Sequence, residues 1–566
     1  YVTADGARVN IGLHGNTARA SKSPSAGSLI AVSLNDGGRA EGSTWPLYWI
    51  ARGAATGHTV RVEYGAGTAS VWTAVATNLP ARILLPYAWN TTPFTSTVYG
   101  LWRVVDEITP TIQDTNDSYF ALRNSAIGFY VNDASTNGDM YTTAIGAPTA
   151  SGAAPSEPLD DLQTLLDRYD LEPGDTVYMD SGNYQLIQRT YRWGRFDAWD
   201  AMTNLAALAA GSSSVTLRGS TNGGTVVSAF QTATALVFTQ ALGVVVRDLS
   251  IRQLVKGNGT AVDVTQSYYA DFIGLHAVDG SVGFVVNDAD GVLFSHCIAR
   301  NNAESGLYTF HSDDTTWRNG VLWSNKYGVL QNDEEGGGLL VENTAIGALS
   351  GGAFAWLRVK GDLVSDYNDI FRANGGFAAG VVESGVLGGG TTRYEKVTSW
   401  YNASGNDTHT LASDPLFAVS TNSDFHPQSP AGRFVTGTGY TTNIGDGLSP
   451  LIDTGRPTTP YAAEPQPNGS RVNIGLYGGT GEASLSPTNG VLVAITFSDG
   501  GSAEGDINLR WAAGGVTTGH TVRLDFSNDG GATWTNIATN VAASLGTYLW
   551  NSVPYGRAAA GLWRLV

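Results

Sequence analysis

The sequence is poor in cysteine, lysine, charge and long apolar runs, and each shortage excludes a class of protein. Cysteine occurs once, as Cys297, so no intrachain disulfide framework holds the fold together. Only 14% of the residues are charged, yet no run of 18 apolar residues occurs, so no segment is expected to span a bilayer. There are 32 basic residues, of which only five are lysines, against 50 acidic ones, and the net charge is −18. This balance excludes nucleic acid as a partner, because no basic stripe can displace counterions from phosphates.

Glycine is abundant, with 71 residues, and 42% of the chain is hydrophobic. Such a composition is typical of many short strands joined by tight turns, so we expect an all-β fold. Scarce cysteine and lysine beside abundant glycine, threonine and asparagine indicate an extracellular or cell-surface bacterial or archaeal protein.

One passage occurs twice. The string RVNIGLHGNTARAS begins at residue 8, and RVNIGLYGGTGEAS begins at residue 471. The text after each copy also matches in register: GHTVR at 57–61 and 519–523, and GLWRVV at 100–105 with GLWRLV at 561–566. A match this long indicates duplication. We therefore expect both ends to be cuts through a longer tandem array.

The duplication and the intervening text predict five parts. These are a terminal coil of a preceding β-helix (1–24), a β-sandwich (25–125), a linker with a capping helix (126–175), a β-helix with its exit (176–486) and a second, truncated β-sandwich (487–566). The sandwiches are expected from short β-rich runs divided by turn residues. Their recurring tryptophans are expected to pack between two sheets, namely Trp49, Trp72, Trp89 and Trp102 and their counterparts Trp511, Trp534, Trp550 and Trp563.

The stretch SEPLDDLQTLLDRYDLEPGD (156–175) has apolar residues at helical spacing, and Ser156 is its expected N-cap. Beyond it, glycines recur about every 23 residues, as expected for a solenoid that buries its core by stacking. The aligned glycines are Gly283, Gly306, Gly328, Gly352 and Gly376, and a second column holds His296, Asn319, Asn343 and Asn368. Cys297 is expected to pack as a small apolar side chain.

Several strings resemble secreted bacterial proteins of the pectate-lyase-like superfamily. PGDTVY (173–178) resembles the entrance of their β-helix, and DPLF, DFHPQSPAG, SPLIDTGRP and the repeated RVNIGLYGG resemble its closing coils. The flanking segments resemble fibronectin type III or immunoglobulin-like modules. The resemblance implies a right-handed parallel β-helix flanked by β-sandwich domains, in a superfamily that includes lyases, hydrolases, epimerases and adhesins.

Charged residues recur at fixed distances from the aligned glycines, so they are expected to form a ladder on one side of the coils. Its candidate catalytic members are His311, Asp313, Asp314, Asp333, Glu335, Arg358 and Lys360. Carboxylates one coil apart could form a retaining glycosidase pair, which needs about 5 Å between them. Alternatively, carboxylates could bind calcium while Arg358 or Lys360 acts as the base of an elimination.

The competing interpretation places these residues at coil corners, where Asp and Glu cap turns and face water. The Gly-His-Gly triplet with an Asp pair, found in lyases and polygalacturonases of this superfamily, does not occur here. This favours the corner interpretation.

Two further strings are candidate ligand sites. Calcium candidates are Asp288 and Asp290 in NDADG, and Asp114 and Asp117 in DTNDS; neither string has a complete calcium loop. The string YRWGRFDAW (191–199) is either a glycan platform or a loop that covers the first coil. Its candidate carbohydrate-binding residues are Tyr191, Arg192, Trp193 and Trp199.

The tandem pattern predicts a structural repeat unit of a long extracellular surface fibre or adhesin, without catalysis. Its partners would be neighbouring repeat units or copies of the same protein, and surface glycans. The alternative is a secreted polysaccharide lyase or glycoside hydrolase acting on an acidic glycan, and the third hypothesis is a glycan-binding module without turnover. No cofactor is required by any of these, although calcium is compatible with all three.

Overall fold

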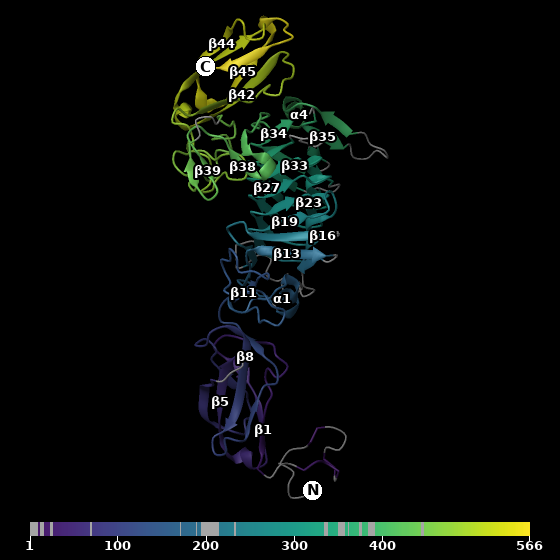
Figure 1. Cartoon of the computed structure of the whole chain (residues 1–566), viewed down its shortest axis with the longest axis vertical. Coiled ribbons are helices and arrows are strands. Elements are labelled where there is room, and N and C mark those ends of the chain that lie inside the picture. The colour runs from purple at the N-terminus through teal and green to yellow at the C-terminus, as the bar shows by residue number, and fades with distance from the viewer. Residues whose placement is uncertain are drawn as a thin grey trace. The chain divides into compact units, whose positions relative to one another are not determined.

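The computed structural model describes residues 10–11, 16–17, 19–22, 26–67, 71–169, 171–187, 190–193, 214–230, 234–332, 338–348, 357–359, 362–372, 376–382, 391–442 and 447–566 (Figure 1). The chain divides into two units: 1–129 with 151–155 and 172–176, and the remaining residues. Most of the expected terminal coil (1–24) lies outside the described residues.

The first unit consists of antiparallel strands around an aromatic core. Its six-stranded sheet contains β2 (Arg39–Ala40), β10 (Phe120–Leu122), β8 (Thr97–Asp106), β5 (Thr59–Ala66) and β6 (Thr73–Pro80), with β9 (Gln113–Thr115) on β8. Two further pairs join β1 (Ser28–Ala31) to β4 (Trp49–Arg52) and β3 (Trp45–Leu47) to β7 (Tyr87–Trp89), and the 3-10 helix η1 (Gly53–Gly57) follows β4.

The tryptophans of this unit divide into two kinds. Trp49, Trp89 and Trp102 are fully buried, which confirms the prediction that they form the core. Trp72 was predicted to join them and does not, because it lies half-exposed under the guanidinium of Arg103, 4.3 Å from the ring centroid.

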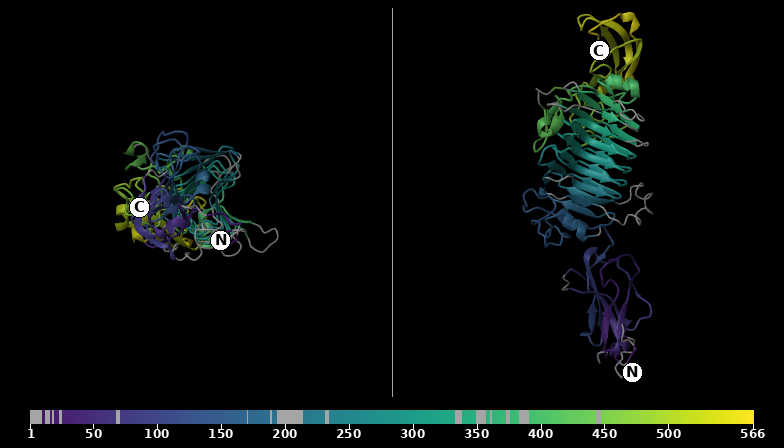
Figure 2. Two further views of the ribbon diagram at one scale, coloured as in Figure 1. Left: turned by 90° about the horizontal axis from the view of Figure 1, so that it is seen from below. Right: turned by 90° about the vertical axis from the view of Figure 1, so that its right-hand side faces the viewer.

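The second unit contains the β-helix, which is built from three parallel sheets (Figure 2). The first sheet contains β11 (Gly128–Val131), β12 (Thr176–Met179), β15 (Val215–Gly219), β18 (Val244–Arg247), β21 (Asp271–Ile273), β24 (Leu293–Ser295), β27 (Thr315–Arg318), β30 (Gly338–Glu342) and β33 (Asp362–Asp366). The second contains β13 (Gly182–Ile187), β16 (Thr225–Phe230), β19 (Ser250–Gln253), β22 (His276–Val278), β25 (Ile298–Arg300), β28 (Val321–Trp323), β31 (Ala345–Ala348) and β34 (Asp369–Arg372). The third contains β14 (Tyr191–Trp193), β17 (Thr234–Thr239), β20 (Thr260–Thr265), β23 (Val282–Asn287), β26 (Ser305–Phe310), β29 (Tyr327–Gln331), β32 (Leu357–Val359), β35 (Ala379–Val382) and the antiparallel β36 (Thr391–Tyr394).

Aromatic rings stack through the interior of these coils. Phe272 pairs in register with Phe294, and Phe294 with Trp317, with ring centroids 5.1 and 5.4 Å apart. Cys297, which follows Phe294 by three residues, is fully buried, as expected, and burial raises the pKa of its thiol to about 12. The interior is therefore a continuous apolar column that forms only when the coils stack.

The predicted glycine column is confirmed for Gly283, Gly306 and Gly328, which occupy the same place on three consecutive strands. Gly352 lies outside the described residues. Gly376 does not belong to the column, because Val329 pairs with Leu357 and Leu357 with Ala379. The alignment of glycines assumed coils of nearly equal length. The coils from β29 to β35 differ in length, so strand pairing sets a different register there.

The second predicted column is a row of corner residues in the left-handed conformation. Its members have φ between 50° and 67°: Asp248, Gly274, His296, Asn319, Asn343 and Tyr367. Asparagine tolerates this conformation better than most residues, which explains its recurrence here. Asn368 was predicted in this column but lies one residue beyond it, where its Oδ1 accepts a hydrogen bond from the backbone N–H of Thr344.

The helix predicted from residue 156 begins later, as α1 (Leu162–Arg168). Asp161, and not Ser156, is its N-cap, and the Asp161 carboxylate accepts a hydrogen bond from the backbone N–H of Thr164. Leu159 instead forms a parallel bridge with Val131. The apolar spacing was read correctly, but part of it belongs to an extended segment.

After the last coil come α4 (Val397–Ser404), β37 (Phe417–Val419), η3 (Ser420–Asn422), β38 (Asp424–Pro427), β39 (Arg433–Val435) and β40 (Gly439–Thr441). The C-terminal antiparallel segment contains β41 (Val491–Ala494), β42 (Asp506–Gly514), β45 (Thr547–Asn551), β44 (Thr535–Ala542), β43 (Thr521–Ser527), β46 (Leu562–Leu565), and the 3-10 helices η4 (Gly515–Gly519), η5 (Ala543–Leu545) and η6 (Val553–Tyr555). The fold class predicted from the sequence, all-β with a parallel β-helix and flanking antiparallel sheets, is confirmed. In the described part of the chain, no helix is long and apolar enough to cross a membrane.

The two antiparallel segments repeat the same internal hydrogen bonds. The indole N–H of Trp49 donates to the carbonyl of Ala81, and that of Trp511 donates to the carbonyl of Ala543. Trp511 and Trp550 are buried, whereas Trp534 repeats the half-exposed position of Trp72 and lies under Arg564. The duplication seen in the sequence therefore extends to packing.

Substitution of Gly306 tests the glycine column. A Cβ there would lie 2.8 Å from a methyl of Leu322 and 2.9 Å from the carbonyl oxygen of Gly328. We expect Gly306→Ala to lower the free energy of unfolding by about 1–3 kcal/mol, as overpacking usually does, measured by denaturant titration followed by circular dichroism. The matched control is Gly481→Ala, because a Cβ at Gly481 meets nothing within 4 Å. Equal losses in the two variants would contradict the role of the column.

Candidate functional site

The described members of the predicted charged ladder lie in two adjacent columns of one corner, the turn that joins the third sheet to the first. Asp288 and His311 occupy one column, together with Gln240 and Gln266, and all four have left-handed φ between 47° and 53°. Both Asp288 and His311 are exposed. The amide of Gln266 donates to the Asp288 carboxylate at 3.2 Å, and the His311 ring stacks on Phe310 with centroids 3.9 Å apart. This column has the geometry of turns, as the corner interpretation predicted.

The next column holds the carboxylates that come closest to a catalytic arrangement. Asp290 and Asp313 are partners in a parallel β-bridge, so they lie on neighbouring coils at the same corner, and Asp314 follows in the left-handed conformation. Asp290 is half-buried, whereas Asp313 and Asp314 are exposed. Burial first, and then the charges of Asp314 and Asp313, raise the pKa of Asp290 above its usual range. We call Asp290, Asp313 and Asp314 the acidic corner.

Three other predicted ladder members lie outside the described residues, namely Asp333, Glu335 and Lys360. Arg358 lies in β32, where its backbone pairs with Leu330 and Gly380, but its side chain is outside the described part.

The aromatic cluster lies against the first coil. Tyr191 is only 3% exposed, and Trp193 stacks obliquely on Phe238 at 6.2 Å between centroids. The backbone N–H of Arg192 donates to Gln163 of α1. Trp199 lies outside the described residues. The described part of the cluster is thus strand β14 of the third sheet and not a loop, with Tyr191 buried and Arg192 exposed. The glycan platform and the covering loop both stay predictions.

The predicted calcium residues of the first unit have protein partners. Asp114 accepts a hydrogen bond from the backbone N–H of Ala31 at 2.8 Å, and Asp117 accepts one from the side chain of Asn35 at 2.7 Å. These bonds tie β9 and the following turn to the N-terminal strands of the same unit. Among the described residues, no group of three His, Cys, Asp or Glu side chains is arranged to hold a metal ion.

The repeated motif at residue 471 packs along the left-handed corner column. The side-chain amide of Asn319 donates to the carbonyl of Gly478 at 2.7 Å, and the backbone N–H of Gly475 donates to the carbonyl of Asn343 at 2.9 Å. Arg471 donates to three carbonyl oxygens, those of Thr454, Gly455 and Ala513. The motif therefore satisfies corner groups of the coils and also contacts β42.

Three buried carboxyl groups were not among the predicted site residues. Burial raises the pKa of Asp369 to about 8, of Glu464 to about 7 and of Asp453 to about 6. Each has one oxygen that accepts hydrogen bonds and one buried oxygen without a partner within the described residues. An ionised carboxylate in such a place is costly, so these groups favour the protonated form.

Comparisons with known proteins add a likeness to solved structures. No protein-family model and no curated protein matches the chain. The catalytic unit of a thermostable GH87 alpha-1,3-glucanase from Streptomyces thermodiastaticus strain HF3-3 is 13% identical, with 58% of this chain and 66% of that chain covered, at a TM-score of 0.28. An alginate lyase from Paenibacillus sp. str. FPU-7 is 13% identical, with 40% and 80% covered, at a TM-score of 0.25.

The protein ORF18 of Geobacillus virus E2 is 11% identical, with 36% of this chain covered, at a TM-score of 0.27. The chain spans 46% of the length of that protein. Likenesses of this size do not establish an activity, so any function has to be argued from the residues themselves.

The buried carboxyls predict how stability depends on pH. Asp369 has an ordinary pKa of 3.8 and a folded pKa of about 8, so the folded state binds the proton more tightly than the unfolded state. Its contribution to stability is therefore complete below about pH 4 and is lost as the pH rises through 8, with a slope of at most about 1.4 kcal/mol per pH unit. We expect denaturant titrations at pH 5, 7 and 8.5 to show falling stability, and Asp369→Asn to flatten the slope.

The control for that measurement is Asp362→Asn, which removes an exposed carboxylate from the neighbouring strand β33. The control should keep the slope of the unsubstituted protein. A slope that Asp369→Asn leaves unchanged would mean that Asp369 does not hold its proton in the folded state.

Proposed function

We propose that this β-helix is a polysaccharide-cleaving module, with the acidic corner as the site of glycoside hydrolysis. The observation that carries this proposal is the pairing of Asp290 with Asp313 on neighbouring coils, with the pKa of Asp290 raised by burial and by the charges of Asp314 and Asp313. This reverses the preference drawn from the sequence, where a fibre without catalysis ranked first.

The chemistry requires one protonated and one ionised carboxyl group on either side of a glycosidic bond. Asp290 would donate its proton to the leaving oxygen, since a raised pKa keeps the proton on it at higher pH than an ordinary carboxyl. Asp313, which is exposed, would attack the anomeric carbon as the leaving oxygen departs with the proton of Asp290. Water would then hydrolyse the glycosyl-enzyme ester and return a proton to Asp290. Neighbouring coils are about 4.8 Å apart, close to the separation of about 5 Å that a retaining mechanism needs.

Asp314 supports the same division of roles. Its charge contributes to the raised pKa of Asp290, and its left-handed backbone holds it beside Asp313 at the corner. In this mechanism Asp314 is a positioning residue that acts through Asp290. His311 lies two residues before Asp313 in the neighbouring column, where its exposed ring could contact the sugar chain.

A second candidate function is the structural repeat unit of an extracellular fibre. It is favoured by the duplicated segments, whose matching indole hydrogen bonds show that both copies keep the same packing. Four further properties are part of these proposals: an extracellular location, kinship with immunoglobulin-like or fibronectin type III modules, self-association and calcium binding. A fibre with a cleaving site in each unit would satisfy both.

The cleavage proposal is tested by incubating the protein with alginate, polygalacturonate and neutral glucans and measuring reducing ends. We expect release from at least one polymer, and a loss of about 10²- to 10⁴-fold in kcat for Asp290→Asn and for Asp313→Asn. Activity should fall as the pH rises through the raised pKa of Asp290, because the proton donor is then ionised. Glu304→Gln is the control, since it removes an exposed carboxylate from another corner of the same coil.

Two results would overturn the assignment. Release that survives both Asp substitutions would place the chemistry elsewhere, and no release from any polymer would favour the fibre. A product with ultraviolet absorbance from a new double bond would indicate elimination instead of hydrolysis.

A further inference from the structure

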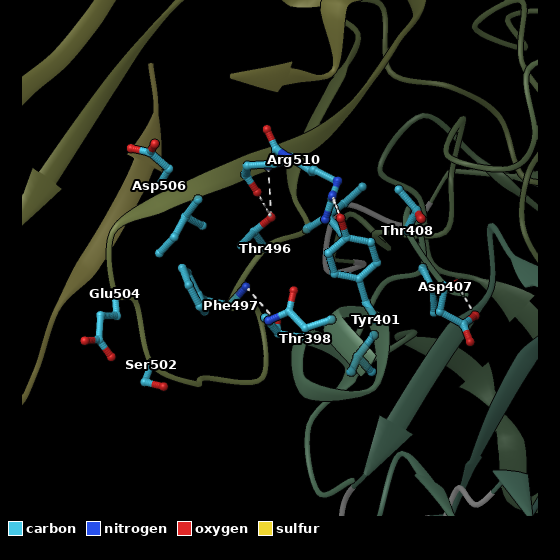
Figure 3. A pocket seen from close by; sticks show the side chains of 16 residues that line it. Thr398, Tyr401, Asp407, Thr408, Thr496, Phe497, Ser502, Glu504, Asp506 and Arg510 are labelled. Carbon is cyan, nitrogen blue, oxygen red and sulfur yellow. Dashed lines mark hydrogen bonds between the residues drawn. The ribbon is translucent and has the colours of Figure 1, made fainter. Parts of the chain in front are cut away.

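A cavity of about 490 Å³ lies within the second unit, between α4 with the segment that follows it and the C-terminal antiparallel sheets (Figure 3). One wall is formed by Thr398, Tyr401 and Thr408, and the facing wall by Thr496, Phe497 and Arg510. The lining as a whole combines hydroxyl-bearing, aromatic, amide and aliphatic side chains with one guanidinium and the three carboxylates of Asp407, Glu504 and Asp506. The acidic corner contributes no residue to this cavity.

Arg510 is the unusual member of this lining. The residue is only 8% exposed, and its guanidinium lies 3.8 Å over the ring of Tyr401, whose hydroxyl accepts its hydrogen bond (Figure 3). Within the described residues no other group accepts from this guanidinium, and no carboxylate forms an ion pair with it. Arg510 lines the cavity, so the remaining donors of its guanidinium can serve an anionic acceptor from outside the chain.

The duplicated segment shows that the sandwich itself does not need this arginine. In the first unit, Tyr48 precedes Trp49 as Arg510 precedes Trp511. The backbone N–H groups of these two residues make equivalent hydrogen bonds. That of Tyr48 donates to the hydroxyl of Ser33, and that of Arg510 donates to the hydroxyl of Thr496. The backbone contact is kept while the side chain differs, so the packing of the sandwich strands does not require the guanidinium.

A separate ion pair links the last coil to the C-terminal segment. Asp499 binds Arg372 of the last coil at 3.0 Å and accepts the backbone N–H of Val397 at the start of α4. Asp407, which also lines the cavity, is already bonded to Ser365, Trp400 and Thr410. These charges are paired and link the two walls, and the contact of Arg510 with Tyr401 adds a further link.

We infer that this cavity binds the carboxylate of an acidic sugar, a hexuronate residue of a polysaccharide. A guanidinium recognises a carboxylate with two parallel hydrogen bonds, and the surrounding threonine hydroxyls suit the ring hydroxyls of a sugar. The half-exposed rings of Tyr401 and Phe497 supply apolar faces against which a sugar ring can pack. The rim carboxylates Glu504 and Asp506 are exposed, where they can accept hydrogen bonds from hydroxyl groups and repel a second anionic residue.

This binding site goes beyond the proposed cleavage and does not depend on it. A protein that cleaves nothing at the acidic corner would still hold a uronate chain here, as a fibre or adhesin would. Conversely, cleavage of a neutral glycan at the corner would leave this inference untouched. The test therefore measures binding in the full chain carrying Asp290→Asn, so that turnover does not interfere.

The experiment is calorimetric titration with a trigalacturonate, its carboxyl-reduced neutral counterpart, and sodium acetate. We expect the uronate trimer to bind and Arg510→Gln to weaken it by about 10- to 100-fold, the range expected for hydrogen bonds to a charged group. The neutral trimer should bind correspondingly more weakly, and acetate alone should not compete at comparable concentration. Arg523→Gln is the matched control, since that arginine already pairs with Asp525 in the same sandwich.

A second variant guards against misfolding of the first. Asn508→Trp adds an indole at an exposed position that lines the cavity, so it should block the ligand without removing an interior contact. Melting curves matching those of the unsubstituted protein would confirm that both variants are folded. Affinity for the uronate trimer that survives both substitutions, or equal affinity for the neutral trimer, would overturn the inference, and competition by acetate would reduce it to a simple anion site.

Discussion

The structure depends on the requirement that every coil return to the same register as the one before it. Parallel pairing in three sheets fixes this register, and each corner must then turn the chain from one sheet to the next within a few residues. The corners meet this requirement with residues in the left-handed conformation, aligned in columns such as Asp248, Gly274, His296, Asn319 and Asn343. Because the coils keep one register, equivalent corner residues of neighbouring coils lie close together, whether buried, as Asn319 and Asn343 are, or exposed. The acidic corner follows from that constraint.

The repeated motif is a second consequence of the same constraint. The backbone groups at a corner are not all used within the coils, and the segment from residue 471 supplies their partners. Gly478 accepts from Asn319 and lies 3.0 Å from His296, while Gly475 donates to Asn343. A glycine-rich sequence suits this work, since a backbone can approach another backbone closely only without a Cβ. Gly455 illustrates the point, because a Cβ there would lie 2.9 Å from the backbone carbonyl oxygen of Val472.

The sequence predicted those features that periodicity encodes. The parallel coils, the stack of Gly283, Gly306 and Gly328, and the corner asparagines Asn319 and Asn343 all follow from spacing. The predictions from spacing were wrong where coil length changed, as at Gly376 and Asn368. In the sequence, an insertion in one coil looks the same as a gradual change in the repeat length. The clearest side-chain ladder was also missed: Asn302 donates to Asn325 on the next coil at 2.9 Å, yet NNAES and SNKYG read as ordinary turns.

The candidate sites were predictable to different degrees for a physical reason. Asp290 and Asp313 could be aligned from the sequence, because they lie on consecutive coils of nearly equal length. That Asp290 alone is half-buried could not be foreseen, because burial depends on how the corner folds over it. Nothing in the sequence marked Asp369 as buried, because an aspartate that follows an asparagine is typical of a solvent-exposed turn. Arg510 was hidden in an alternating strand, where its partner Tyr401 is more than a hundred residues away.

The duplicated segments offer the strongest argument about which residues serve the fold and which serve something else. Positions that keep both their residue and their hydrogen bond, such as Trp49 and Trp511, belong to the packing of the sheets. The pairs of Arg and Trp on the sheet surface are kept as well, with Arg103 over Trp72 and Arg564 over Trp534, so their stacking is also part of the module. Arg510 differs from these because its counterpart, Tyr48, carries no charge while the backbone bond is unchanged. A buried charge introduced at one copy of a duplicated position costs stability unless something compensates it. Tyr401 compensates only in part, with one hydroxyl and one ring face, which leaves the remaining donors of the guanidinium to the cavity and to the ligand it holds.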